Sequence, residues 1–218
     1  MSPVVAHLDP IVKTIALTMG VAWASGINLY AAILVLGILG STGNITLPPD
    51  LLVLSDPLVI VAAGVMYVVE FFADKIPGVD TGWDTVHTFI RIPLGALLAA
   101  AAVGEVKPAF VVAAALLGGT MAATTHALKS GSRVLINTSP EPVTNWFTSL
   151  GEDAAVVAGL WTALHYPLVF VLFLAAFILL CLWLLPKIWK GVRKVFLLLA
   201  DLFRPKQTAS PAREQEDK

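Results

Sequence analysis

Residues 154–185 read AAVVAGLWTALHYPLVFVLFLAAFILLCLWLL and contain no Asp, Glu, Lys or Arg. Roughly 20 consecutive apolar residues are enough for an α-helix to span a bilayer, whereas the strands of a membrane barrel alternate apolar and polar residues. The whole chain of 218 residues is 57% hydrophobic and 13% charged, with a mean hydropathy of +0.83. This composition excludes a soluble domain and predicts an all-α polytopic membrane protein, with no role in binding nucleic acid.

Six apolar segments, two of which overlap this stretch, are expected to be transmembrane helices. Together they form a membrane domain of residues 10–186. They cover residues 10–40, 58–72, 80–104, 109–136, 143–165 and 168–185. Gly26 and Asn28 weaken the first helix near its middle, Pro93 allows a kink in the third, and Pro186 is expected to end the last. An even number of spans places both chain ends on the same side of the membrane.

The charges of the chain are unevenly distributed. Residues 1–186 carry 6 basic and 11 acidic groups, whereas residues 187–218 carry 8 basic and 4 acidic groups. A basic segment next to the last span predicts a cytoplasmic C-terminus. Residues 187–204, both apolar and basic, predict an amphipathic helix on an anionic lipid surface, and residues 205–218 predict a disordered cytoplasmic tail. Cys181 is the only cysteine, which excludes an intramolecular disulfide.

A weak internal repeat connects the two halves of the chain. Residues 16–25 are similar to residues 115–124, and residues 72–94 are similar to residues 147–168. Inverted repeats are typical of secondary transporters, which bind substrate at broken helices between the repeats. With six spans, the first pair would run in opposite directions and the second pair in the same direction. The inverted repeat and the six-span count therefore conflict.

The charged residues of the apolar region gather in residues 70–91, EFFADKIPGVDTGWDTVHTFIR. They are Glu70, Asp74, Lys75, Asp80, Asp84, His87 and Arg91. The last four share one face of a helix, and Glu70 lies one turn before Asp74. Charges at membrane depth cost several kcal/mol unless they are paired, and are normally kept for a pathway or a binding site. Two interpretations remain, a pocket inside the membrane or a helix end among lipid headgroups.

A second charged set lies on the expected helix of residues 109–136. His126, Lys129 and Arg133 are spaced for one helix face. Lys129 and Arg133 either bind an anion or extend to the aqueous interface as positive anchors. Glu152 and Asp153 either pair with these bases or stabilise a helix N-terminus through its dipole.

Two motifs resemble one known family. EFFADKIP at residues 70–77, followed by DTGWDTVHTFIR at residues 80–91 and by Pro93, resembles the membrane family catalogued as domain of unknown function 4126. TSPEP at residues 138–142, with the acids Glu152 and Asp153, is similar to a second signature of that family. The resemblance covers about residues 12–185. It implies a multi-pass protein of a prokaryotic inner membrane or a plastid-type membrane, and it implies no activity.

The leading functional hypothesis is a small secondary transporter or lipid-phosphate translocase that needs no cofactor. The candidate residues for binding an anionic substrate are Arg91, Lys129, Arg133, His126 and Asn28. The candidate residues for proton relay or ion coupling are Glu70, Asp74, Asp80, Asp84, His87, Glu152 and Asp153.

Two rival hypotheses remain open. One is an intramembrane enzyme in which the same carboxylates and His87 bind a divalent metal ion. The other is a non-catalytic assembly or scaffold protein, whose charges lock its helices together. The expected partners are membrane lipids, with anionic headgroups at residues 187–204, and a homo-oligomer is left open.

Overall fold

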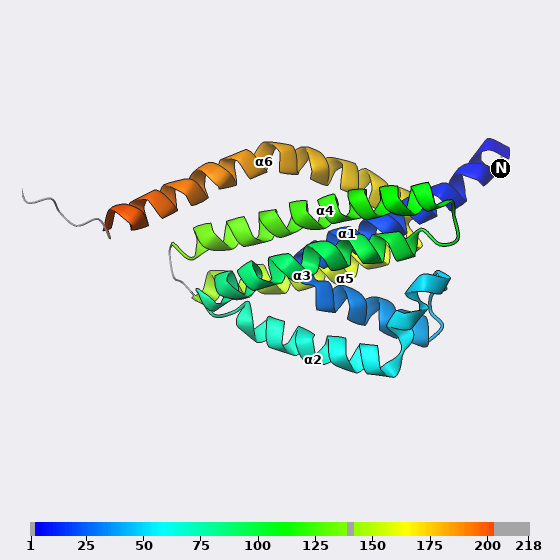
Figure 1. Cartoon of the computed structure of the whole chain (residues 1–218), viewed down its shortest axis with the longest axis horizontal. Helices are drawn as coiled ribbons and strands as arrows, with labels where there is room; N and C mark the ends of the chain where they lie inside the picture. Colours follow the sequence, from blue (N-terminus) through cyan, green and yellow to red (C-terminus); the bar gives the residue numbers. More distant parts are fainter. Residues whose placement is uncertain (1–2, 139–141, 203–218) are drawn as a thin grey trace, which may run out of the picture.

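The structure is a computed structural model that describes residues 3–138 and 142–202. Within these residues the chain is all helical, which confirms the predicted fold class. The helices are α1 (Pro3–Ser41), the short 3₁₀ helix η1 (Pro49–Ser55), α2 (Pro57–Ala73), α3 (Val79–Ala102), α4 (Pro108–Ile136), α5 (Pro142–His165) and α6 (Pro167–Leu202). Figure 1 shows them as an elongated bundle with the long helices side by side. The predicted tail at residues 205–218 lies outside the described residues.

Proline and glycine residues set most helix boundaries near the predicted positions. Pro57, Pro108 and Pro167 stand at the first position of their helices, where the missing N–H group has no helical partner to lose. Gly78 and Gly104 have φ angles of +85° and +77° in the turns on either side of α3. Residues with a Cβ adopt such angles rarely, so glycine suits these two turns.

Pro186 does not end α6, contrary to the sequence prediction. The helix continues to Leu202, and Pro186 lies inside it. The residues after Pro186 pack against α4, where Ile188 lies close to Gly131 and Gly191 lies close to Leu135. This packing compensates for the backbone hydrogen bond that Pro186 cannot make, so the helix continues past the proline. A separate interfacial helix at residues 187–204 is therefore not confirmed.

Asn28 divides α1 into two helical segments. Its φ and ψ angles of −146° and 99° are not helical. In Figure 1 the residues before Asn28 run from the chain's N-terminal end toward the middle of the bundle, and the residues after it return toward the same end. Packing agrees, because Gly26 lies at Thr125 in the second half of α4 whereas Gly37 lies against Ile60 near the start of α2. The first helix is thus a re-entrant hairpin, and its predicted weak point is where it reverses.

The predicted six spans are not confirmed. Four helices are long and apolar enough to cross a membrane, namely Asp9–Ser41, Val79–Ala102, Pro108–Ile136 and Pro167–Ala200, among the residues described. The bent pair of η1 and α2, which meet at 66°, gives a fifth if it is counted as one span. The start of α1 and the end of α6 lie at opposite ends of the bundle (Figure 1), because α1 reverses. The expectation that both ends share one side therefore does not match this arrangement.

The inverted repeat is not confirmed either. In Figure 1 the first segment of α1 runs in the same direction as α4, and α3 runs in the same direction as α5. These helices contain the similar stretches 16–25 with 115–124, and most of 72–94 with 147–168. Both pairs therefore have a parallel relation. The conflict noted in the sequence arose from treating α1 as a single crossing.

The first segment of α1 forms the centre of the bundle. The Trp23 ring makes edge-to-face contacts with Phe170, Phe173 and Phe177, at centroid distances of 6.1, 5.4 and 6.0 Å. On the other side Ala22 lies against Gly118, where the absence of a side chain lets the helices approach closely.

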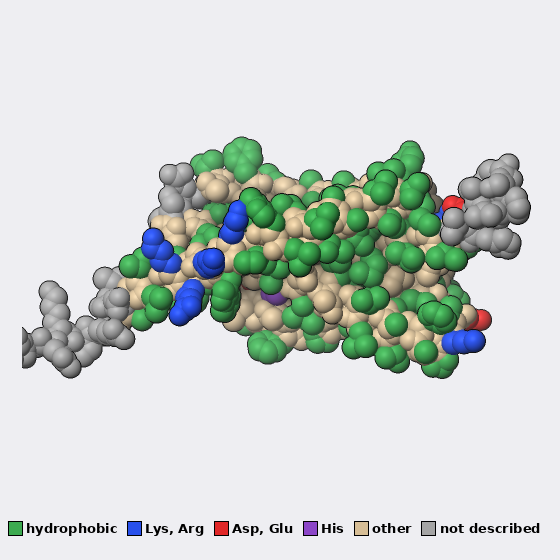
Figure 2. Space-filling view, turned by 90° about the horizontal axis from the view of Figure 1, so that it is seen from above, with side chains coloured by type: hydrophobic (Ala, Val, Ile, Leu, Met, Phe, Trp, Pro, Cys, Tyr) green, Lys and Arg blue, Asp and Glu red, His purple; other side chains and the backbone are tan. Residues whose placement is uncertain are grey.

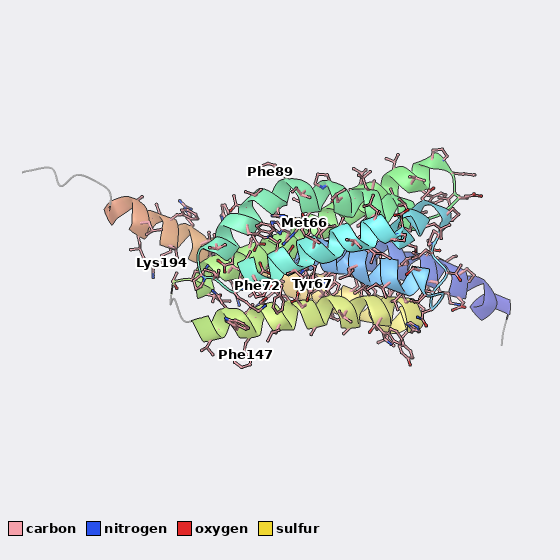
Figure 3. The ribbon with its side chains drawn as sticks, turned by 90° about the horizontal axis from the view of Figure 1, so that it is seen from below. Met66, Tyr67, Phe72, Phe89, Phe147 and Lys194 are labelled. Atoms are coloured by element: carbon pink, nitrogen blue, oxygen red, sulfur yellow. The ribbon has the colours of Figure 1, made fainter. Side chains whose placement is uncertain are left out.

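Large apolar side chains cover the outside of the bundle. Phe72, Phe89 and Phe147 are exposed and point outward (Figure 3). Figure 2 shows hydrophobic side chains over most of one face, with Lys and Arg gathered on the C-terminal part of α6. A contiguous apolar exterior is expected for helices surrounded by lipid. The chain is therefore a multi-pass helical membrane protein.

The re-entrant α1 predicts an unusual labelling pattern. In a Cys181→Ala background, Asp9→Cys and Thr46→Cys should react with a membrane-impermeant maleimide from one side of the membrane, and Lys194→Cys from the other. The reason is that α1 enters and leaves at the same end of the bundle. Reaction of Asp9→Cys and Lys194→Cys from the same side would contradict this topology.

Candidate functional site

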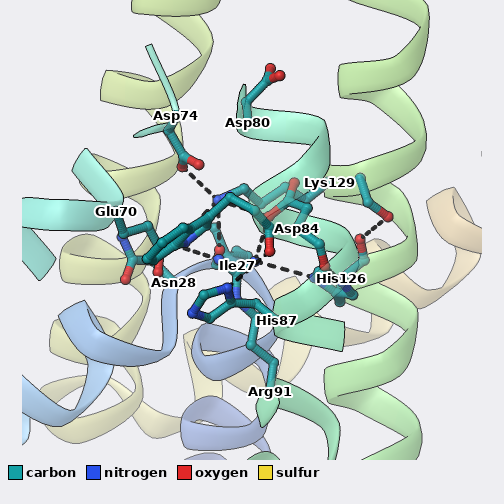
Figure 4. A network of polar contacts seen from close by, with 12 residues as sticks. Ile27, Asn28, Glu70, Asp74, Asp80, Asp84, His87, Arg91, His126 and Lys129 are labelled. Carbon is teal, nitrogen blue, oxygen red and sulfur yellow. Dashed lines mark hydrogen bonds and ion pairs between the residues drawn. The ribbon is translucent and has the colours of Figure 1, made fainter. Parts of the chain in front are cut away.

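Charged side chains from four helices meet beside the tip of the α1 hairpin. We call the ion-paired set the charge network; it comprises Glu70, Asp74, Asp80, Asp84, Arg91, Lys129, Arg133 and Glu152. All of them except Glu152 are buried, and Glu152 is 15% exposed. Figure 4 shows most of these side chains converging from α2, α3 and α4. The alternative of a helix end among lipid headgroups is therefore wrong for α3.

Arg91 joins α3 to α2 at the centre of the charge network. Its Nη2 donates to Glu70 Oε1 at 2.5 Å, and its Nη1 donates to Asp84 Oδ1 at 3.0 Å. The side chains of Arg91 and Glu70 are completely buried. Asp84 and Arg91 are seven residues apart on one helix, so two turns bring them onto the same face. Arg91 is therefore paired with an acid on its own helix and with an acid from α2.

Lys129 connects α4 to α2 and to the break in α1. Its Nζ donates to Asp74 Oδ2 at 2.6 Å and to the Ile27 carbonyl at 3.1 Å. In a continuous helix that carbonyl would accept from the Ala31 N–H group, which here donates to Asn28 Oδ1 at 2.9 Å. The break at Asn28 thus frees a backbone acceptor, and Lys129 occupies it (Figure 4).

Arg133 connects α4 to α5. Its Nη2 donates to Glu152 Oε2 at 2.6 Å, and its Nη1 donates to the Asp74 carbonyl at 2.9 Å and lies 3.8 Å from Asp80 Oδ2. Because both Lys129 and Arg133 are buried and paired, they are not anchors at the aqueous interface.

Asp153 and the two histidines stand beside the ion pairs. Asp153 has no ion pair with a base among the described residues; it accepts hydrogen bonds from Asn28 Nδ2 at 3.0 Å and from the Tyr67 hydroxyl at 3.2 Å. His126 lies 3.2 Å from Arg91 Nη1, so it belongs to the same constellation. His87 instead contacts the Tyr30 hydroxyl at 3.1 Å and the Trp83 carbonyl at 2.9 Å, and within the part of the chain that the structure describes it bonds no carboxylate.

Several polar neighbours were not among the predicted site residues. Tyr67 and Tyr30 bond Asp153 and His87, and Asn137 Nδ2 donates to Asp80 Oδ1 at 2.8 Å. A tyrosine in an apolar helix can indicate a polar site from the sequence alone, because its hydroxyl needs a hydrogen-bond partner at membrane depth. Lys75 lies over the Phe71 ring at 2.9 Å and donates to Ser149 Oγ at 3.2 Å.

The site residues lie within the part of the chain that matches a protein-family model. Residues 15–187 match the family model described as Domain of unknown function (DUF4126). The chain belongs to the DUF4126 family. The match includes the whole charge network and ends one residue beyond Pro186, and it confirms the resemblance of the two sequence motifs. No curated protein and no solved structure matches the chain.

The charge network of this DUF4126 protein has an excess of acids. Five carboxylates (Glu70, Asp74, Asp80, Asp84 and Glu152) face three bases (Arg91, Lys129 and Arg133). Within the described residues one oxygen of each of four carboxylates is buried without a hydrogen-bond donor. These atoms are Glu70 Oε2, Asp74 Oδ1, Asp80 Oδ2 and Asp84 Oδ2. Such oxygens are available to protons, water or small cations.

The arrangement also bears on a metal site. Among residues 3–138 and 142–202 no three His, Cys, Asp or Glu side chains are placed to hold a metal ion together. The carboxylates point to the guanidinium and ammonium groups instead. We therefore derive no reaction step through a metal.

Proposed function

We propose that this DUF4126 protein is a proton-coupled secondary transporter, and that the charge network is its coupling site. The excess of carboxylates over bases at membrane depth carries this proposal. An uncompensated buried charge costs several kcal/mol, so the resting network favours states in which the excess carboxylates hold protons or a cation. The buried carboxylates belong to one connected set of ion pairs. A proton gained at one of them therefore changes the hydrogen bonds of the others.

In this proposal the three bases hold the carboxylates in place rather than bind an anionic substrate. Arg91, Lys129 and Arg133 each already bind carboxylates at 3.0 Å or less. An anionic substrate such as a lipid phosphate would have to displace these internal partners. The geometry therefore supports proton coupling more than anion binding, with the bases holding the carboxylates in place.

The broken α1 helix provides an element that such coupling can move. Lys129 holds the Ile27 carbonyl at the break, and Asn28 is bonded to Asp153. Transporters commonly place broken helices at the substrate and ion sites near the membrane midplane. A change in the charge of the network would alter the bonds that Lys129 makes, and so weaken the attachment of the hairpin tip.

The distribution of exposed charge supports an orientation in a prokaryotic inner membrane. The α6 end exposes Lys187, Lys190, Arg193 and Lys194. The opposite end exposes four acids, Asp9, Asp50, Asp56 and Glu105, with two bases, Lys13 and Lys107. Positive residues favour the cytoplasmic side, so the α6 end is cytoplasmic and its bases meet anionic lipid headgroups.

A pH-gradient assay tests the proposal. Protein in liposomes with an imposed pH gradient and a trapped pH dye is exposed to fractions of a bacterial small-molecule extract. We expect at least one fraction to dissipate the gradient with wild-type protein and with the exposed-acid control Asp50→Asn, but not with Asp84→Asn. The amide keeps the shape of the Asp84 side chain and loses its charge and its proton site.

The same assay separates the rival functions. A scaffold protein would leave the gradient intact with every fraction and every variant. An enzyme would convert a compound in the extract without moving protons across the membrane. Either result would overturn the transporter proposal.

A further inference from the structure

A cavity of about 310 Å³ lies beside the charge network, bounded by α1, α4, α5 and α6. Ile27, Leu128, Ala155 and Phe177 form apolar walls, and Lys129 and Glu152 stand at its polar side. Its size is within the range of small-molecule pockets, which combine apolar walls with a few fixed polar groups.

The cavity opens toward the apolar exterior of the bundle. Helix α5 packs mainly against α1, and α4 packs mainly against α3 and then α1, whereas α4 and α5 barely contact each other. Helix α6 lies beside α1 at Phe170 and crosses to α4 at Ile188, which leaves a space between α4 and α5. Gly151 lines this space and is exposed. A ligand can therefore approach from the lipid phase without crossing the ends of the bundle.

The polar side of the cavity carries one carboxylate, on Glu152, and one ammonium group, on Lys129. Glu152 is the one member of the charge network with appreciable exposure, at 15% of its side chain, within the described residues. Its Oε2 accepts from Arg133, and its Oε1 makes no hydrogen bond in the described part of the chain. Lys129 also borders the cavity, but its ammonium group lies within 3.8 Å of four carboxylates, on Asp74, Glu70, Glu152 and Asp84.

From these observations we infer that the cavity binds an amphipathic organic cation. An ammonium or phosphonium group lies at Glu152, and the apolar body lies between Leu128, Ala155 and Phe177. The inference rests on the proposed transporter function and names its substrate class. The cation adds positive charge beside the charge network, so its binding and proton uptake by that network oppose each other, which is the exchange that a proton-coupled exporter needs.

Two ions of nearly equal size and opposite charge test this inference. Binding of tetraphenylphosphonium and of tetraphenylborate to the purified full-length protein is measured by equilibrium dialysis. We expect the phosphonium to bind and the borate not to bind. The phosphonium affinity should fall as the pH is lowered, because protons taken up by the charge network reduce the negative charge beside the cavity.

Three variants localise the binding. Glu152→Gln should weaken phosphonium binding by about tenfold or more. Gly151→Phe should block binding by filling the cavity. The matched control is Gly82→Phe, since a Cβ meets no atom within 4 Å at either glycine and Gly82 does not line the cavity.

Two results would overturn the inference. One is equal binding of both ions, or preferential binding of the borate. The other is phosphonium binding that Gly151→Phe and Gly82→Phe affect equally. If the phosphonium does not bind but the extract assay shows proton-coupled flux that requires Asp84, the substrate class is wrong and the transporter proposal stands.

Discussion

Arg91→Ala should lower the free energy of unfolding by about 3–5 kcal/mol, because it removes the nearest base of the buried Glu70 and Asp84 and leaves both with the more distant Lys129 alone. The measurement is a denaturant titration of the protein in bicelles. The matched control is Lys13→Ala, which removes an exposed ion pair with Asp9 and should cost no more than about 1 kcal/mol.

A compensated variant distinguishes lost pairing from lost packing. Arg91→Met combined with Glu70→Gln and Asp84→Asn removes the base and both charges together, and should recover most of the stability lost in Arg91→Ala. If Arg91→Ala were no more destabilising than Lys13→Ala, the ion pairs at the centre of the charge network would not exist in the membrane.

Gly26→Val should prevent the protein from folding. Gly26 precedes the break in α1, and a Cβ at this position would overlap the Thr125 side chain and the Ala122 carbonyl of α4. Overpacking in a tight interior costs about 1–3 kcal/mol or more, and backbone atoms cannot move aside as a side chain end can. We expect little monodisperse protein after extraction in detergent, measured by size-exclusion chromatography.

Gly64→Ala is the control for this helix-packing prediction. A Cβ at Gly64 meets only Leu34 Cδ1, at 3.8 Å, which is ordinary contact. This variant should extract like the wild type. Equal yields of Gly26→Val and Gly64→Ala would show that α1 does not pack against α4 as the structure has it.

Local sequence signals predicted the helices and much of the site. Apolar runs and prolines placed every long helix from α2 onward within a few residues of its start. The helical spacing of Asp84 and Arg91 placed both on one face, and the high energy of unpaired charge in a membrane required an acidic partner such as Glu70. These inferences succeeded because they depend on helix period and on charge pairing.

Local sequence signals could not predict the reversal of α1. Gly26 and Asn28 indicated a weak helix, but the direction of the chain after the break depends on contacts with residues about 100 positions away. Lys129 on α4 binds the freed Ile27 carbonyl, and Asp153 on α5 binds Asn28. For the same reason Asp153, for which pairing with a base was one of two interpretations, accepts from the uncharged side chains of Asn28 and Tyr67.

The most direct test of the central claim is an infrared measurement of the carboxyl groups in membranes. If the charge network exchanges protons, the wild-type protein should show a protonated-carboxyl C=O band that shifts in D₂O and changes with pH around neutrality. Glu70→Gln and Asp84→Asn should each diminish this band, and the exposed-acid variant Asp50→Asn should leave it unchanged. The excess of five carboxylates over three bases predicts this result. A network with no protonated carboxyl band from mildly acidic to mildly alkaline pH would be a fixed set of ion pairs, and that result would contradict a coupling site.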